Sequence, residues 1–149
     1  MTKNWDYSNP HLNQFRVKQE HIDSLGHTNN RVYTDWCEQT AWAHSSALGL
    51  DATDYAQLRR AMAIQEANYH YLLPSFYQDE VVVATWLTSS DNRVRMERSF
   101  QISDQSSGQC LFRGTWKLIC INLSTNKPAR MPKEFINTYL PHVVKQPLA

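Results

Sequence analysis

The chain has 149 residues, 42% of them apolar, and includes five Trp, seven Tyr and five Phe. This length and aromatic content suffice for one domain with a sizeable core and argue against intrinsic disorder. With 15 basic and 14 acidic residues the formal charge is +1. No strong net field is therefore available to hold a nucleic acid or an anionic membrane.

The amino end is polar and lacks the apolar core of a secretory signal. No apolar run approaches the roughly 20 residues that span a bilayer. Cys37, Cys110 and Cys120 form an odd set without CxxC spacing, which predicts reduced thiols. We therefore expect a cytoplasmic protein without membrane insertion. It should form one domain over residues 1–149, with its core at about 13–132.

The first half of the chain predicts a strand followed by a long helix. Alternating apolar and polar residues suit a strand from about Asn13 to Ile22, and a break follows at Asp23–Gly26. A helix is expected from about Asn30 to Leu48, because apolar side chains recur there at steps of three and four residues. Gly49 suits the position just after its end. The apolar stripe consists of Tyr33, Trp36, Cys37, Ala41, His44, Ala47 and Leu48.

The second half predicts strands separated by turn signals. A polar connection at 51–60 precedes them, and residues 133–144 read as a short helix or an irregular tail. The expected strands cover residues 61–73, 80–89, 94–103 and 110–123. Hairpins between consecutive strands imply an antiparallel sheet, and the single helix must cover its apolar face. The fold class is therefore α+β.

The segment between the first strand and the helix carries the clearest chemical pattern. Asp23, Gly26 and His27 stand directly before Asn29 and Asn30. A helix N-terminus presents unpaired N–H groups and a positive dipole, so it can polarise a carbonyl and stabilise an oxyanion. A carboxylate beside it can activate water or attack an acyl group directly. The pattern favours a site of acyl transfer.

Two motifs resemble one protein family. The run Asp23–Asn30 reads Asp-x-x-Gly-His-x-Asn-Asn and is followed by Tyr33 and Glu38. It resembles the signature of the 4-hydroxybenzoyl-CoA thioesterase-like acyl-CoA thioesterases. A second run, Tyr71–Glu80, resembles the Tyr-x-x-Pro-x-x-x-Gly-Asp entry of that family into its next strand. Gln78 departs from this pattern, because the family usually has glycine there.

The resemblance implies a hotdog fold, in which an antiparallel sheet of about five strands wraps around one long helix. It implies a homodimer or homotetramer with acyl sites at the subunit interface, and hydrolysis of acyl-CoA thioesters to free acid and coenzyme A. No metal or other cofactor is expected. Asp23 matches the catalytic carboxylate of the family, as nucleophile or general base, with helix N-terminal amides polarising the thioester carbonyl. The sequence does not determine the acyl specificity, nor whether the thiol partner is CoA or an acyl-carrier protein.

Each residue of the first motif also has a structural interpretation. Asp23 alone reads as a turn residue that caps the following backbone. His27 can act as general acid, bind the thioester oxygen or orient the loop, and Glu38 is read as a partner that holds the catalytic loop. We expect Asp23 and His27 as catalytic residues. The substrate-binding set is expected to be Gly26, Thr28, Asn29, Asn30, Tyr33 and Glu38.

The remaining reactive residues favour structural roles. Cys37 lies on the apolar stripe and reads as a packing thiol, and the six His lack the spacing of metal ligands. Most of the basic side chains are expected on the solvated surface, where a subset could hold the phosphates of coenzyme A. These are Arg59, Arg60, Arg93, Arg95, Arg98, Lys127 and Arg130.

Two other functions fit the sequence less well. Asp6–His11 echoes the Asp-x-Asn-Pro-x-His motif of hotdog enoyl-CoA hydratases and dehydratases, but its spacing differs and no helix follows. A non-enzymatic acyl-CoA-binding sensor usually carries a DNA-binding segment, and no helix-turn-helix pattern fits the short flanks. Hydrolysis of an acyl-CoA thioester is therefore the preferred expectation.

Overall fold

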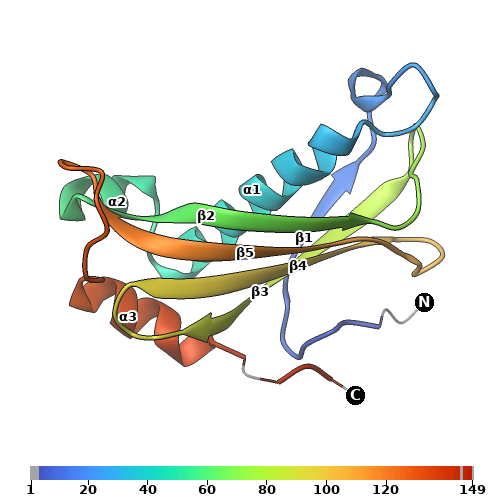
Figure 1. Cartoon of the computed structure of the whole chain (residues 1–149). Helices are drawn as coiled ribbons and strands as arrows, with labels where there is room; N and C mark the ends of the chain where they lie inside the picture. The colour runs from blue at the N-terminus through green and yellow to red at the C-terminus, as the bar shows by residue number, and fades with distance from the viewer. Residues whose placement is uncertain (1–3, 145, 149) are drawn as a thin grey trace.

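A five-stranded antiparallel sheet and one long helix against it make up most of the structure (Figure 1). The structure is a computed structural model and describes residues 4–144 and 146–148. The strands are β1 (His11–Arg16), β2 (Arg60–Tyr71), β3 (Glu80–Ser90), β4 (Arg95–Asp104) and β5 (Cys110–Asn122), in the order β1-β3-β4-β5-β2. The expected α+β class with an antiparallel sheet is confirmed.

Helix α1 (Asn30–Leu48) begins and ends where the sequence predicts. The Asn29 side chain accepts a hydrogen bond from the Arg31 N–H at 3.1 Å, which caps the first turn. Gly49 adopts φ 111°, a left-handed conformation that glycine reaches without steric cost. Ala47, expected on the apolar stripe, is exposed. The buried side of α1 consists of Val32, Tyr33, Trp36, Cys37, Thr40, Ala41, His44 and Ser45.

Strand β2 does not pair with the strand that follows it. It pairs with β5 at one edge of the sheet, whereas β3 lies between β1 and β4. The expectation of hairpins between all consecutive strands is therefore wrong for β2 and β3. Residues 72–79 carry the chain from β2 to β3 past the start of α1, where the Thr28 N–H donates to the Ser75 carbonyl at 2.9 Å. This crossing brings a distant segment to the predicted site.

The first strand is shorter than predicted, because β1 ends at Arg16 and Gln19–His21 forms a 3₁₀ turn, η1. The Lys18 N–H donates to Nδ1 of His21 at 2.9 Å, which closes this turn locally. The backbone of Val17 pairs instead with the crossing segment, since its N–H donates to Asp79 and its carbonyl accepts from Gln78. Backbone hydrogen bonds thus continue past the end of β1 without a regular strand.

Short helices fill the remaining segments. Helix α2 (Ala52–Leu58) forms where a polar connection is expected, because Asp51 and Asp54 bond reciprocally to each other's backbone N–H as a capping box. Of the two alternatives expected for residues 133–144, the structure shows the helical one, as helix α3 (Lys133–Tyr139) and the 3₁₀ turn η2 (Leu140–His142). No helix in the described parts of the chain is long and apolar enough to cross a membrane.

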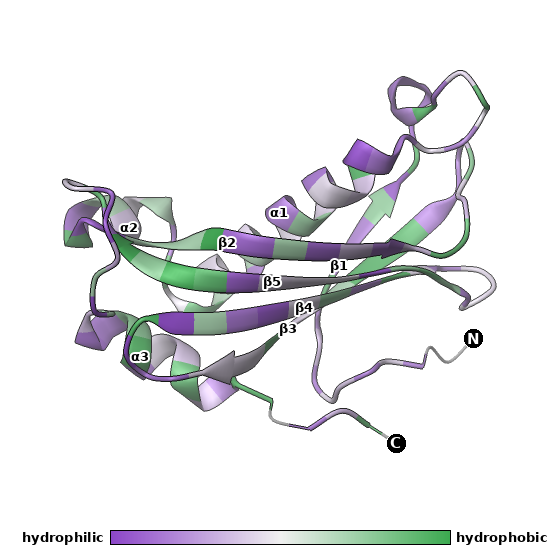
Figure 2. Ribbon diagram, in the orientation of Figure 1, coloured by the Kyte–Doolittle hydropathy of each residue, from purple (hydrophilic) through white to green (hydrophobic). Residues whose placement is uncertain are grey.

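The core lies between α1 and the inward side of the sheet. Hydrophobic and hydrophilic positions are interspersed along β2, β4 and β5, as expected of strands with one side turned to the core (Figure 2). Phe100, Ile102 and Phe112 are fully buried, and α3 adds Phe135 and Tyr139 to the same cluster. Burial of each such side chain stabilises the fold by roughly 1.5–3 kcal/mol. This packing fixes α1, and therefore the residues at its first turn.

Candidate active site

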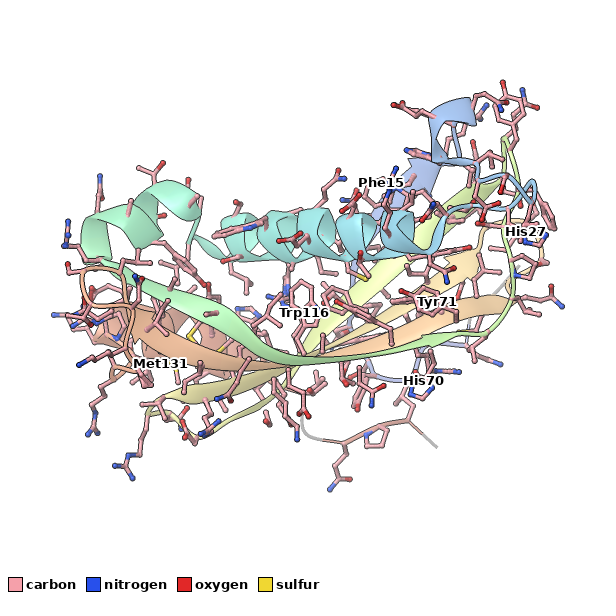
Figure 3. All side chains as sticks on the ribbon, turned by 45° about the horizontal axis from the view of Figure 1, so that its top comes forward. Phe15, His27, His70, Tyr71, Trp116 and Met131 are labelled. Atoms are coloured by element: carbon pink, nitrogen blue, oxygen red, sulfur yellow. The ribbon has the colours of Figure 1, made fainter. Side chains whose placement is uncertain are left out.

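A hollow of about 420 Å³ lies at the N-terminal end of α1. It is lined by Asp23, Leu25, His27, Thr28, Asn29, Asn30, Tyr33, Tyr71, Leu72, Leu73 and Pro74. The residues before α1 form one wall, and the end of β2 with the crossing segment forms the other. Figure 3 shows His27 and Tyr71 at this end of the helix. The two sequence motifs therefore meet in space.

The loop backbone holds the Asp23 carboxylate in place. Oδ1 accepts hydrogen bonds from the N–H groups of Leu25 at 2.9 Å and His27 at 3.2 Å. The Gly26 N–H donates to the Asp23 carbonyl at 3.1 Å, and Gly26 adopts φ 81° to close the turn. Oδ2 has no hydrogen-bond partner within residues 4–144 and 146–148. Asp23 thus caps its loop with one oxygen and keeps the other available.

Most backbone N–H groups before α1 are already occupied. Those of Gly26 and His27 donate to Asp23, that of Thr28 donates to Ser75, and that of Asn29 donates to the His21 carbonyl at 2.8 Å. For the Asn30 N–H, the first residue of α1, the described residues provide no acceptor. One amide at the positive end of the helix dipole is therefore free, and it belongs to a residue that lines the hollow.

Ser75 joins the two walls of the hollow, and sequence reasoning missed it. Its Oγ donates to Thr28 Oγ1 at 2.7 Å, and Thr28 Oγ1 donates to the Ser75 carbonyl at 3.1 Å. Because these hydrogens are used, the Tyr33 hydroxyl is the donor in its 2.7 Å contact with Ser75 Oγ. Burial raises the pKa of Tyr33, so it stays a neutral phenol. The second motif contained the signal, since Ser75 follows its proline.

His27 and Glu38 occupy different surroundings. The His27 ring packs edge-on against Phe76, with ring centroids 5.4 Å apart, and its nitrogens have no partner in the described chain. Glu38 does not line this hollow; it is exposed and borders a second cavity further along α1. Of the eight expected site residues, six therefore line the hollow, Gly26 shapes its loop, and Glu38 lies apart.

Gln78 occupies the family's glycine position in the backbone conformation that glycine favours. Its φ is 72°, and its N–H donates to the Val17 carbonyl at 2.9 Å. The carboxylate of Asp79 accepts from the Phe76 N–H at 2.8 Å and closes the same turn. The turn is thus built despite the side chain, at a steric cost of about 1 kcal/mol for a left-handed residue.

Two expectations about reactive side chains have different outcomes. Cys37 is fully buried, which confirms the packing role, and burial raises the pKa of its thiol. Arg98 was expected on the surface, and this is wrong: only 4% of it is exposed. It lies two residues from Met96 and from Phe100 on β4. Because side chains alternate between the two sides of a strand, all three point to the inward side of the sheet, despite the charge of Arg98.

No cluster of His, Cys, Asp or Glu in the described residues could hold a metal ion.

A five-stranded antiparallel sheet packed on one long helix defines the hotdog class of folds. Residues 17–138 match the family model described as the thioesterase-like superfamily. The chain belongs to this superfamily, in agreement with the resemblance of its two motifs.

Solved structures share the fold. A 1,4-dihydroxy-2-naphthoyl-CoA thioesterase from Synechocystis has a TM-score of 0.79 at 19% identity, over 89% of this chain and 96% of that one. A DHNA-CoA thioesterase from Staphylococcus aureus has a TM-score of 0.75 at 23% identity, over 89% and 84%. A hypothetical protein from Staphylococcus aureus in complex with CoA has a TM-score of 0.85 at 17% identity, over 99% and 92%.

Proposed function

We propose that this protein hydrolyses acyl-CoA thioesters to a free acid and coenzyme A, with Asp23 as the catalytic carboxylate. One observation carries the proposal: Asp23 and Asn30, whose backbone N–H has no acceptor among the described residues, line the same hollow. The first supplies a negative oxygen, and the second a donor at the positive end of α1. The CoA thioesterases and the CoA complex among structures of this fold support CoA as the thiol partner.

The reaction adds water across the thioester bond. Oδ2 of Asp23 either attacks the carbonyl carbon or removes a proton from the attacking water. The carbonyl oxygen gains negative charge as the bond to oxygen forms, and the Asn30 N–H stabilises it. The carbon–sulfur bond then breaks, and the CoA thiolate leaves and takes up a proton. His27, which also lines the hollow, assists at the oxygen or at the sulfur.

A thiol-trapping assay across short, long and aromatic acyl-CoAs tests this proposal. Asp23→Asn keeps the size of the side chain and removes its charge, so kcat should fall by about 10²- to 10⁴-fold. Asp35→Asn is the matched control, because Asp35 is exposed on α1 and does not line the hollow. Equal rates in wild type and Asp23→Asn would overturn the assignment. Binding of acyl-CoA without turnover by the wild type would favour a non-enzymatic sensor.

Single-turnover hydrolysis in ¹⁸O-labelled water tests whether Asp23 attacks the carbonyl, because label in the protein requires a covalent intermediate on Asp23. If Asp23 attacks the carbonyl, hydrolysis of the mixed anhydride at the aspartyl carbon leaves the label in the protein. If Asp23 activates water, or if water attacks the anhydride at its acyl carbon, the label enters the product acid. Mass spectrometry of the peptide that contains Asp23 measures the difference.

We further propose that the protein forms a homo-oligomer through β2. This edge strand has 12 residues and pairs with β5 on one side, and its other side has no partner strand among the described residues. Unpaired edges invite pairing with another chain. Exposed apolar side chains accompany this edge: Ile64, Tyr71, Leu72 and Leu73. Light scattering should give a mass of at least twice the 17.4 kDa of the chain; a monomer would contradict the proposal.

A further inference from the structure

A second cavity, of about 250 Å³, lies between the later turns of α1 and the sheet. It is lined by Glu38, Ala41, Trp42, Ser45, Tyr55, Met62, Ile64, Met96, Arg98, Trp116, Leu118 and Tyr139. Trp42 and Ile64 are 40% and 46% exposed, so they lie where the cavity meets the surface between α1 and β2. Figure 3 shows Trp116 between the helix and the sheet. The walls are mostly apolar and aromatic.

Among the described residues that line this cavity, Arg98 is the one cation. Its Nη1 donates to His44 Nδ1 at 3.0 Å and to Thr85 Oγ1 at 3.1 Å. For Nε and Nη2 the described residues provide no acceptor. Burial lowers the pKa of the guanidinium to about 10, which leaves it charged at neutral pH.

No carboxylate of the described chain neutralises Arg98. The ion pairs within these residues are Arg16–Glu80, Arg113–Asp6 and Lys117–Glu66. Glu38 is the one acidic residue among the described residues of the lining, but it is exposed and makes no ion pair with Arg98. Buried charges in proteins are normally paired, because an isolated buried cation loses its hydration without compensation. The guanidinium therefore lacks a counter-charge.

The neighbouring hydroxyl groups cannot donate to an anion. Ser45 Oγ donates to the Leu50 carbonyl, so the Tyr139 hydroxyl donates to Ser45 Oγ at 2.7 Å. Tyr55 then donates its hydrogen to Tyr139 at 2.5 Å. The hydrogens of all three hydroxyl groups are therefore already donated. Arg98 therefore remains as the charged donor for a negative group among the described residues that line this cavity.

We propose that this cavity binds a small carboxylate with an apolar body, whose negative group pairs with Arg98. A volume of about 250 Å³ equals that of roughly eight waters at about 30 Å³ each, which suits an acid of about eight to ten heavy atoms. The apolar walls receive its body, and a guanidinium can hold a carboxylate by two parallel hydrogen bonds. The carboxylate comes either from a free acid or from the far end of a carboxyl-terminated acyl group. The second source rests on the proposed function, and the first does not.

Titration with octanoate and benzoate tests the site, and octanamide and benzamide serve as uncharged counterparts. Thermal unfolding and the fluorescence of Trp42 and Trp116 report binding. At about ten times Kd the acids should raise Tm by roughly 4 °C. The amides should bind at least about tenfold more weakly, because they lack the charge. Equal binding of acids and amides, or no response to either acid at 10 mM, would overturn the proposal.

Arg98→Met removes the charge and keeps much of the side-chain volume. It should weaken acid binding by about tenfold or more and leave amide binding unchanged. Its Tm without ligand should not fall below that of wild type, because the variant no longer buries an unpaired cation. Arg95→Met on the exposed side of β4 is the control and should bind the acids as wild type does. Acid binding to Arg98→Met with wild-type affinity would overturn the proposal, and the comparison of acid with amide holds even if this variant does not fold.

The source of the carboxylate is distinguished by kinetics. Hydrolysis of dodecanedioyl-CoA is compared with that of lauroyl-CoA in wild type and Arg98→Met. If kcat/KM is at least tenfold higher for dodecanedioyl-CoA than for lauroyl-CoA in wild type, and this preference is lost in Arg98→Met, the carboxylate is the end of an acyl group. Acid binding without such a preference identifies a free acid. If no acyl-CoA is hydrolysed at all, the proposed function is wrong. The titration with acids and amides still tests the cavity proposal in that case.

Discussion

Two cavities lie along α1 and are built in different ways. The hollow at the first turn contains Asp23, His27 and Asn30, which are close in sequence, and hydrogen bonds within the loop hold Asp23 and His27 together. The cavity beside the later turns draws its lining from α1, α2, α3 and three strands. Its charged residue, Arg98, is placed by strand alternation and by the packing of distant segments.

This difference indicates which kind of functional site can be predicted from a sequence. A site made of local turns and a helix start uses residues whose spacing fixes their geometry. A site made by packing uses residues whose neighbours come from elsewhere in the chain. We therefore expect changes in the hollow to alter activity more than stability, and changes in the later cavity to alter stability first.

Trp116→Ala should give the largest effect and would sharpen this contrast. Trp116 is buried, packs edge-on against Phe100 at 4.6 Å and donates from Nε1 to the Tyr69 hydroxyl at 2.8 Å. Its truncation should lower the free energy of unfolding by about 3–5 kcal/mol, measured by urea denaturation. Trp42→Ala at the exposed rim is the control and should cost much less. Equal losses for both would mean that burial does not set the cost.

Asn30→Pro removes the backbone N–H of the first residue of α1 and tests the role of this N–H in the reaction. Proline is well tolerated at the first position of a helix, and Asn29 already has φ −60° and ψ 137°, which suit a residue before proline. Asn30→Pro should keep the unfolding free energy within about 0.5 kcal/mol of wild type, because the fold loses no hydrogen bond. It should lower kcat by about 10²- to 10³-fold, since the oxyanion loses its donor.

Asn30→Ala provides the control for this prediction, since it removes the side chain and keeps the N–H. Thiol-release rates should then remain close to those of wild type. A large loss in both variants would show that the Asn30 side chain, not the backbone, interacts with the substrate. Full activity in Asn30→Pro would remove this amide from the mechanism.

His44, which accepts a hydrogen bond from Arg98 of the later cavity, should make the stability of the protein depend on pH. It stacks on His11 at 4.9 Å and accepts from Arg98, and burial, with Arg98, His11 and His142 nearby, lowers the pKa of His44 to about 3. The unfolded chain binds this proton from about pH 6.5, so between pH 6.5 and 3 it holds more protons than the folded chain. Stability should therefore fall as pH falls through this window.

His44→Gln keeps a hydrogen-bond acceptor for Arg98 and cannot take up the proton. The urea midpoint of this variant should decline less between pH 7 and pH 4 than that of wild type. Carboxylates titrate in both proteins, so the difference between the two slopes reports His44. Parallel slopes would show that His44 does not contribute.

Thr40→Val should give a small gain. Thr40 is fully buried on α1, and its Oγ1 is the one fully buried side-chain oxygen or nitrogen in the described residues without a hydrogen-bond partner. Valine has the same shape without the unsatisfied hydroxyl, so the free energy of unfolding should rise by about 1 kcal/mol. Thr34→Val is the control, because Thr34 Oγ1 donates to the Arg31 carbonyl at 2.8 Å on the exposed side. A loss of stability in Thr40→Val would contradict this reading.

The sequence determined the parts of this protein that depend on nearby residues. The ends of α1 follow from Asn29 and Gly49, and the grouping of Asp23, His27 and Asn30 follows from a short turn before a helix. Even α2 had a local signal, the capping box of Asp51 and Asp54. In each case the interactions that fix the conformation lie within a few residues, so spacing alone contains the information.

Only the tertiary structure decided the rest. The position of β2 beside β5, and hence the passage of Ser75 across the start of α1, depends on strand pairing between segments far apart in the chain. Arg98 shows the same limit: its charge predicted the surface, and its place on the inward side of β4 left it buried. Burial is set by the elements that pack over a residue, and those elements come from every part of the chain.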